Sequence, residues 1–175
     1  MIALQQQVIA YWLIPAKAQR ELFRAIIRIL ARQTGGPQFE PHVTIFVATN
    51  AKKSPREILP QINILPVRLR VDGMGVSGAF TKTLFVRLHP ERALDDLSLA
   101  LARLTRSRRK PVRDPHLSLL YKKLPARAKG ELAAMVKLPF RSVQFDSIKA
   151  VRCALPTRTA SEVERWKVLA TKSLR

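Results

Sequence analysis

The sequence predicts an α+β fold with mostly antiparallel strands, and three observations support this prediction. Hydrophobic residues make up 47% of the 175 residues, which is enough apolar surface for a buried core. Segments with the two-residue period of strands are mixed with segments of helical period. The helical segments are too few to supply the crossover helices of a doubly wound parallel sheet. The length fits one domain, or two small lobes that share a core.

The first half of the chain is expected to contain two strands and a long helix. The strand Val8–Pro15 precedes a helix over about 16–32, which ends at Gly35-Gly36-Pro37. One face of this helix carries the apolar residues Leu22, Ile26, Ile29 and Leu30. The strand His42–Val47 follows. A capping box with proline at the first helical position, Ser54-Pro55-Arg56-Glu57, then predicts a short helix.

The second half continues with the same mixture. Strands are expected at Val67–Val76 and Thr81–His89, and a helix is expected from about Glu91 to Arg106 with its leucines on one face. A basic loop leads to the remaining elements, which are a strand at His116–Tyr121, a helix near Ala126–Val136, and strands near Val143–Val151 and Trp166–Thr171.

The charge points to an anionic partner. Lys and Arg number 32 against 12 Asp and Glu, so the net charge is +20, and the excess runs along the whole chain. Such a balance attracts polyanions, and guanidinium groups suit phosphate oxygens. We therefore expect a nucleic acid or a nucleotide as partner, although a genome rich in G and C would also favour arginine codons.

Two clusters of cations could contact that partner. The first is a row spaced four residues apart along the first helix, where like charges repel slightly and need solvent or an anion; it comprises Arg20, Arg24, Arg28 and Arg32. The second precedes the strand at His116 and is a candidate RNA or phosphate contact, with plain solubility as the alternative; it comprises Arg103, Arg106, Arg108, Arg109, Lys110 and Arg113.

The sequence also bears on the compartment. Cys153 is the only cysteine, so no internal disulfide can form, which fits a reducing compartment. The longest apolar run, Val8–Ile14, is far too short to span a bilayer, and the N-terminus lacks the basic start of a secretory signal. A cytoplasmic protein is expected.

A short motif occurs twice around two of the three histidines. Glu40-Pro41-His42-Val43-Thr44-Ile45 and Asp114-Pro115-His116-Leu117-Ser118-Leu119 both read acid, proline, histidine, aliphatic, hydroxyl, aliphatic. In a strand, residues i and i+2 share a face, so His42 and Thr44 project together, and so do His116 and Ser118. The intervening aliphatic residues point into a core. If the two strands lie side by side, two imidazoles and two hydroxyls converge.

This set of side chains suits attack on a phosphodiester. Near neutral pH one imidazole can be a neutral base while the other is a charged acid, and the hydroxyls can hydrogen-bond phosphate oxygens. A zinc site lacks a third ligand, Mg²⁺ chemistry lacks clustered carboxylates, and a serine triad lacks its nucleophile elbow. Each histidine alone could also be structural. The third, His89, has no hydroxyl at i+2 and is interpreted as structural.

The paired motifs resemble the signature of the two-histidine phosphoesterase superfamily. Phe39–Thr44 and Pro115–Tyr121 look like its cyclic nucleotide phosphodiesterase branch, to which Tyr11–Pro15 and Val163–Trp166 are also similar. The resemblance implies a single two-lobed domain over residues 1–175, with mostly antiparallel sheets forming a central cleft around a pseudo-two-fold axis and helices outside. It covers nearly the whole chain, although only the histidine motifs are specific.

The resemblance also implies an activity without a metal or other cofactor, namely the opening of 2′,3′-cyclic nucleotides or of ADP-ribose 1″,2″-cyclic phosphate. One of His42 and His116 would be the base and the other the acid, and Thr44 and Ser118 would hold phosphate oxygens. Trp12 and Tyr121 match aromatic positions that contact substrate in the family. Trp12 could equally belong to the core, and strict alternation places Tyr121 on the face opposite His116.

Two alternatives follow from the charge, because the chain is much more basic than this branch. The substrate could be the cyclic phosphate end of an RNA, as in the branch resembling the RNA 2′-5′ ligases, with the RNA lying on Arg106–Arg113. The chain could also be an RNA-binding module without catalysis, although binding alone would not need a histidine in both motifs.

Overall fold

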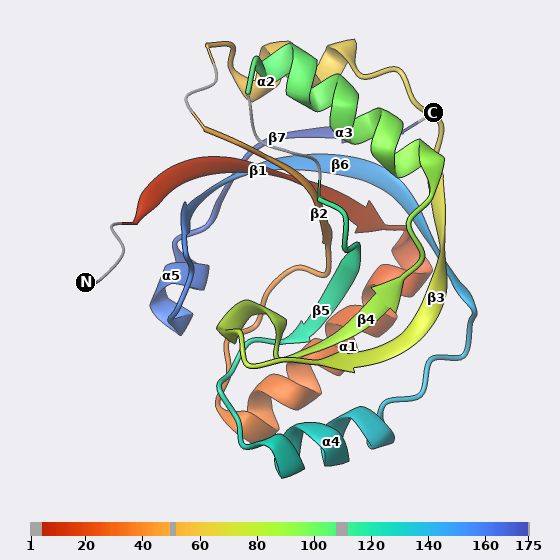
Figure 1. The fold of residues 1–175 in the computed structure, drawn as a ribbon, viewed down its shortest axis with the longest axis vertical. Coiled ribbons are helices and arrows are strands. Elements are labelled where there is room, and N and C mark those ends of the chain that lie inside the picture. The colour runs from red at the N-terminus through yellow and green to blue at the C-terminus, as the bar shows by residue number, and fades with distance from the viewer. Residues whose placement is uncertain (1–4, 50–51, 108–111, 175) are drawn as a thin grey trace.

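The strands of the computed structural model form one seven-stranded sheet with the order β1-β2-β5-β4-β3-β6-β7 (Figure 1). The structure describes residues 5–49, 52–107 and 112–174. The strands are β1 (Gln6–Pro15), β2 (Val43–Ala48), β3 (Val67–Val76), β4 (Leu84–Leu88), β5 (His116–Leu120), β6 (Ser142–Leu155) and β7 (Lys167–Ser173). Within the described residues every strand pair is antiparallel, which confirms the predicted fold class.

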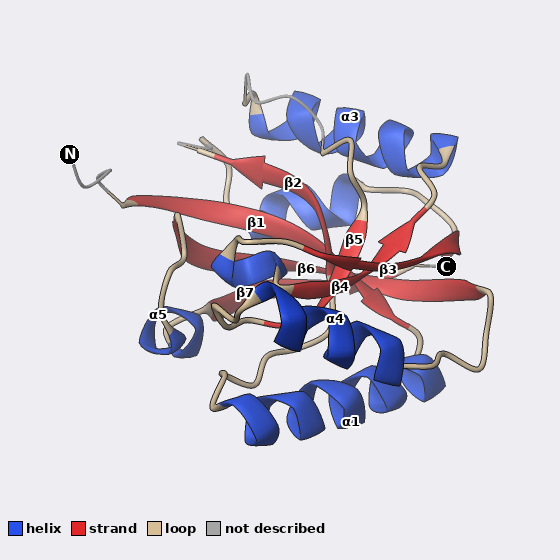
Figure 2. Ribbon diagram, turned by 60° about the horizontal axis from the view of Figure 1, so that its bottom comes forward, coloured by secondary structure: helices blue, strands red, loops and turns tan. Residues whose placement is uncertain are grey.

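Five helices and two short 3₁₀ turns accompany this sheet in the described ranges. The helices are α1 (Lys17–Thr34), α2 (Pro55–Ile58), α3 (Arg92–Thr105), α4 (Ala126–Met135) and α5 (Ala160–Glu164), and the turns are η1 (Leu59–Gln61) and η2 (Phe80–Lys82). Figure 2 shows α1 and α4 on one side of the strands and α3 on the other. None of the described helices has the length and apolar composition needed to cross a membrane.

Strand β6 joins the two halves of the sheet. It pairs with β1 from Phe145 to Leu155, with β3 over its first residues and with β7 further along. On the far side of the sheet, β2 and β5 are joined by the single pair Val43↔Leu117. The strands β1, β2, β5, β4, β3 and β6 therefore form a closed circuit, in which β2, which directly follows His42, is the neighbour of β5, which begins at His116.

The core is mainly aliphatic, and α1 enters it through a face one residue away from the predicted one. The buried residues of α1 are Phe23, Ile27, Leu30 and Ala31, whereas Ile29 is 54% exposed. On the observed face, the ring of Phe23 packs edge-on against Phe140, with 5.7 Å between the ring centroids. The helix ends as expected, because Gly35 adopts a left-handed φ of 69° and its N–H bonds to the Ala31 carbonyl.

Two other elements differ from expectation. The strand predicted at Thr81–His89 begins only at Leu84, because the chain first forms the turn η2, which the Thr83 hydroxyl ties to the Lys122 carbonyl at 2.6 Å. Helix α5 was not predicted, although its signal is present in the sequence. Thr159 and Glu162 form a reciprocal capping box at its start.

Candidate active site

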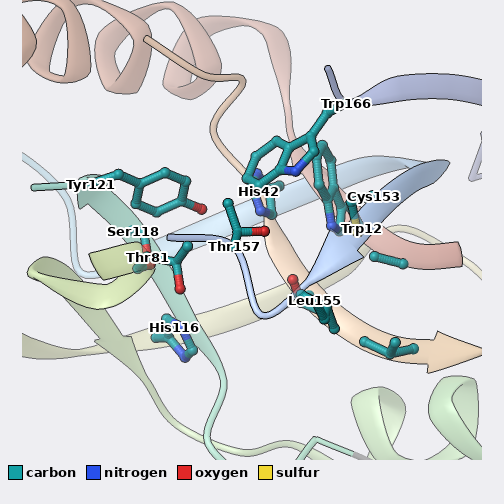
Figure 3. A pocket seen from close by; sticks show the side chains of 13 residues that line it. Trp12, His42, Thr81, His116, Ser118, Tyr121, Cys153, Leu155, Thr157 and Trp166 are labelled. Atoms are coloured by element: carbon teal, nitrogen blue, oxygen red, sulfur yellow. The ribbon is translucent and has the colours of Figure 1, made fainter. Parts of the chain in front are cut away.

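The two histidine motifs lie on neighbouring strands. Val43 of β2 is paired with Leu117 of β5, and in an antiparallel pair this register sets His42 across from Ser118 and Thr44 across from His116. Val43, Ile45, Leu117 and Leu119 belong to the core, as the alternation predicts. The four polar side chains of the motifs border a single pocket (Figure 3).

This pocket has a volume of about 140 Å³ and brings together all six residues predicted for the site. In Figure 3, His42 lies beside Trp12 and Trp166, and His116 lies on the side of Ser118 and Thr81. The lining comprises Ala10, Trp12, His42, Thr44, Val47, Thr81, His116, Ser118, Tyr121, Cys153, Leu155, Thr157 and Trp166.

Both imidazoles form the same hydrogen bond, between Nδ1 and the backbone carbonyl two residues earlier in the chain. Nδ1 of His42 lies 2.6 Å from the Glu40 carbonyl oxygen, and Nδ1 of His116 lies 2.8 Å from the Asp114 carbonyl oxygen. Because a carbonyl only accepts, Nδ1 carries the proton in each ring. The other ring nitrogen, Nε2, is therefore the one that can exchange a proton with a ligand in each imidazole.

The proline in each motif explains why this hydrogen bond occurs in both motifs. A residue that precedes proline is confined to extended conformations, so Pro41 restricts the backbone of Glu40 and Pro115 restricts that of Asp114. The restriction fixes the direction of the carbonyl two residues before each histidine. The acid-proline-histidine order thus sets imidazole orientation through the main chain.

The two histidines differ in burial. His42 is 7% exposed, and burial lowers its pKa to about 4, although the hydrogen bond to the Glu40 carbonyl acts in the other direction. His116 is half-buried, and its pKa is also lowered, first by burial and then by the nearby Lys82 ammonium. Both imidazoles of the free protein are therefore neutral at pH 7.

The acidic side chains of the motifs form ion pairs away from the imidazoles. Both carboxylate oxygens of Glu40 lie 2.7 Å from Lys149 Nζ, and Arg24 approaches one of them at 3.2 Å. Asp114 pairs with Lys82, whose ammonium also lies over the ring of Phe85. Among the described residues, the hydrogen bond to each imidazole comes from the main-chain carbonyl of the acidic residue and not from its carboxylate.

Trp12 lies against His42. The indole and imidazole are stacked, with 3.7 Å between centroids and 12° between planes, and Trp12 is 4% exposed. A β-bulge brings them together, because the β1–β2 register shifts between Tyr11 and Trp12 and places Trp12 opposite Thr44. The extra residue lets Ile45 and Phe46 both enter the core while Thr44 and Val47 both face the pocket.

Tyr121 reaches the pocket because β5 ends one residue before it. Strict alternation is therefore no longer imposed, and the ring turns into the lining. There it stacks on Phe39 with 3.7 Å between centroids, and it is 3% exposed. Burial raises the pKa of its phenol, so this group stays protonated.

The two hydroxyls of the motifs are in different states. Ser118 Oγ donates to the Thr81 carbonyl oxygen at 2.8 Å. The structure records no hydrogen bond for the Thr44 hydroxyl within the described residues, so its proton is free to be donated to a ligand. Ser118 must give up its bond to Thr81 before it can donate in the same way.

Several lining residues were missed by the sequence analysis. Thr81 comes from η2, Thr157 follows β6, and Trp166 precedes β7; their positions arise from tertiary structure rather than from a local pattern. Trp166 is half-buried, and its ring meets Trp12 edge-on at 5.3 Å between centroids. It is the most accessible large aromatic ring of the lining.

A glycine makes room for the ring that supports His116. Gly75 pairs with Phe85 across β3 and β4, and a Cβ at position 75 would lie 2.4 Å from the Phe85 ring. That ring contacts the His116 imidazole edge-on at 5.4 Å between centroids. Glycine at 75 is therefore required for this support.

The described residues of the basic cluster before β5 do not line the pocket. Arg103, Arg106 and Arg113 are exposed, and none of them lines the pocket. The predicted contacts at Arg108, Arg109 and Lys110 lie outside the described residues. Among the residues that the structure describes, no three His, Cys, Asp or Glu side chains gather in a way that could hold a metal ion.

Comparisons with known proteins give a matching family model and solved structures with the same fold. A family model described as the 2′-5′ RNA ligase superfamily matches residues 37–153, which include both histidine motifs. No curated protein sequence matches the chain.

Solved structures with the same fold are similar over almost the whole chain. Escherichia coli LigT in complex with 3′-AMP has 18% identity and a TM-score of 0.56, and LigT in complex with NADP⁺ has 18% identity and a TM-score of 0.55; each alignment covers 98% of this chain and 99% of the other. A crystal structure described as a phosphoesterase has 16% identity and a TM-score of 0.54, covering 97% and 98%. At these identities the likeness shows a shared fold.

Proposed function

The chain belongs to the 2′-5′ RNA ligase superfamily, and from this premise we propose that it is a phosphodiesterase that opens cyclic phosphates by acid–base catalysis between His42 and His116. The substrates proposed are 2′,3′-cyclic nucleotides or ADP-ribose 1″,2″-cyclic phosphate. The observation that carries the proposal is the convergence of two imidazoles, each with Nδ1 bonded to a backbone carbonyl, on one pocket.

The proposed reaction is a single displacement at phosphorus. The Nε2 atom of the neutral histidine takes a proton from water as the water oxygen bonds to phosphorus. The bond between phosphorus and one ribose oxygen breaks, and the Nε2–H of the protonated histidine gives its proton to that oxygen. The two rings end with their protonation states exchanged, and solvent restores them.

Hydroxyl groups would stabilise the charge that develops on the phosphate. Thr44 lies opposite His116 in the strand register and Ser118 lies opposite His42, so each hydroxyl can reach the non-bridging oxygens between the imidazoles. The Thr44 hydroxyl is free to donate, and Ser118 can exchange the Thr81 carbonyl for a phosphate oxygen.

The aromatic residues would have separate roles. One face of Trp12 is covered by His42 and the ring is almost fully buried, which favours positioning of the imidazole over contact with a base. Tyr121, with a protonated phenol in the lining, is proposed as a substrate contact. The half-buried ring of Trp166 is the surface on which a base could stack.

The end of an RNA is the second candidate substrate. Two observations support this candidate. The net charge of +20 is far more positive charge than is required to bind a single free nucleotide, and the chain belongs to the 2′-5′ RNA ligase superfamily. An RNA-binding module without catalysis is the remaining alternative.

We expect purified protein to hydrolyse 2′,3′-cyclic AMP or a short RNA ending in a 2′,3′-cyclic phosphate, with the rate unchanged by EDTA. No step above needs a metal, so chelation removes nothing that the reaction uses. Separation of 2′- from 3′-phosphates identifies the leaving oxygen, and the ratio of kcat/KM values chooses between nucleotide and RNA. Loss of activity to EDTA would contradict the proposal, and tight salt-sensitive RNA binding without turnover would favour the binding module.

The pH dependence of kcat/KM is expected to be bell-shaped, with its maximum on the acid side of pH 6.5. This parameter reports the free protein, in which catalysis needs one protonated and one neutral imidazole. Burial lowers the pKa of His42 to about 4 and that of His116 below its usual value, so both limbs move to lower pH. The profile of kcat should lie at higher pH, because a bound phosphate anion favours the imidazolium. A basic limb of kcat/KM above pH 7 would contradict this account.

A further inference from the structure

A second cavity, of about 360 Å³, adjoins the proposed active site. The two cavities share Trp166 and Cys153 as lining residues, so they border the same part of the chain. The second cavity lies where the start of β1, the end of β6 and the segment from α5 to β7 meet. Three of its lining residues are cations, namely Arg152, Arg165 and Lys167.

Two of these cations face each other directly. Arg152 of β6 is the register partner of Lys167 of β7, and both side chains are exposed. Like charges at directly opposed positions of an antiparallel pair destabilise it. The pair is therefore an arrangement that an anion bound between the two side chains would stabilise.

The three cations carry more charge than the acidic part of the lining. Among the described residues, none of the three forms an ion pair, and Arg165 Nε donates only to the Ser161 carbonyl, at 3.2 Å. Glu162 is the acidic residue of the lining and keeps its negative charge, because its hydrogen-bond partners are neutral groups, so the three cations exceed it by two charges. It accepts the backbone N–H groups of Arg158 at 2.5 Å and Thr159 at 3.0 Å in the cap of α5, and the side-chain amide of Gln5.

We infer that this cavity, which we call the second phosphate site, binds a further phosphate group of the substrate beyond the one that reacts. The inference rests on the proposed function. Arginine and lysine are the side chains that bind phosphate, and the cavity shares Trp166 with the pocket that contains the two imidazoles. A base that stacks on Trp166 would bring the next phosphate toward the cavity that this residue also borders.

Two substrates carry such a phosphate, and 2′,3′-cyclic AMP does not. In an RNA that ends in a cyclic phosphate, it is the phosphodiester that precedes the last nucleotide. In ADP-ribose 1″,2″-cyclic phosphate, it is the diphosphate. The second phosphate site thus provides a physical basis for preferring either of them to a free cyclic nucleotide. The cations Arg103, Arg106 and Arg113 line neither cavity.

The test compares three substrates in two double variants. The substrates are 2′,3′-cyclic AMP, the dinucleotide ApA with a 2′,3′-cyclic phosphate, and ADP-ribose 1″,2″-cyclic phosphate. The variant is Arg152→Gln with Lys167→Gln. Its control, Arg141→Gln with Lys137→Gln, removes the same two charges from exposed positions that line neither cavity.

The wild-type protein should show a kcat/KM on the order of tenfold higher for a substrate with a second phosphate, since one charge-assisted contact has about that effect. The Arg152/Lys167 variant should lose this advantage and keep its activity on 2′,3′-cyclic AMP, while the control keeps both. If kcat/KM is higher only for ApA with a 2′,3′-cyclic phosphate, the site binds a phosphodiester. If it is higher only for ADP-ribose 1″,2″-cyclic phosphate, the site binds a diphosphate. An equal loss on all three substrates, or the same loss in the control, would overturn the inference.

Calorimetric binding separates this inference from the proposed function. ApA with a 3′-phosphate should bind more tightly than 3′-AMP, and the slope of log K against log salt should be smaller in magnitude by about 1 to 2 in the Arg152/Lys167 variant. If the wild-type protein binds the two ligands equally, the second phosphate site is wrong whatever the protein hydrolyses. If binding discriminates them but no cyclic phosphate is opened, the proposed function is wrong and the site stands.

Discussion

Replacing His116 by alanine is expected to lower kcat for the opening of 2′,3′-cyclic AMP by roughly 10²–10⁴-fold, the range over which general acid or base groups contribute. His42→Ala should have an effect of the same size. Because the two imidazoles exchange one proton in one displacement, the double variant should be hardly slower than either single variant. Initial rates in EDTA, with folding checked by circular dichroism, measure this.

His116 is the cleaner of the two tests. His116 is half-buried. His42 is stacked on Trp12, so removal of the His42 imidazole would leave a cavity against the indole ring. His89→Ala is the matched control, because this third histidine lies outside the pocket and pairs with Asp72 at 3.5 Å. Full activity in His116→Ala would rule out the two-histidine mechanism, even if His42→Ala were inactive.

Removing the hydroxyls of the two motifs is expected to slow the reaction by about 10- to 1000-fold, as loss of oxyanion donors does. Thr44→Val should have the larger effect, because its hydroxyl is free to donate, whereas Ser118 must first release the Thr81 carbonyl. Valine keeps the shape of threonine and Ser118→Ala removes one atom, so packing is little changed. The measurement is kcat, with KM for comparison.

A threonine outside the site provides the control for these variants. The Thr34 hydroxyl, on α1, donates to the Leu30 carbonyl at 2.8 Å and lines no part of the pocket. Thr34→Val should therefore leave kcat unchanged. If Thr44→Val and Ser118→Ala both retained kcat within twofold of the wild-type value, the proposed contacts of these hydroxyls with the phosphate would be wrong.

The central part of the site could be predicted because its pattern is local. Period-two alternation around His42 and His116 predicts which residues enter the core, and the repetition of the motif predicts that its two copies act together. What the pattern could not supply was their contact. That depends on the single pair Val43↔Leu117, formed between segments far apart in the chain.

The remaining lining could not be predicted for the same physical reason. Thr157 and Trp166 reach the pocket because β6 spans both halves of the sheet and carries the last part of the chain to it. The pairing of Trp12 with Thr44 needs a bulge in β2 that no local preference indicates. Helix α5 is different, since the capping box of Thr159 and Glu162 at its start is a local sequence signal. The organisation of residues 1–175 as a single domain with two lobes stays a prediction.

The backbone contacts of the two imidazoles affect how the motif can change over evolutionary time. Since the acceptors are the carbonyls of Glu40 and Asp114, a mutation that alters either side chain leaves the hydrogen bond to the histidine in place. The selective constraint on orientation therefore falls on Pro41 and Pro115, which hold those carbonyls in direction. Positions 40 and 114 are free to drift as far as orientation is concerned, and to acquire side chains suited to other neighbours.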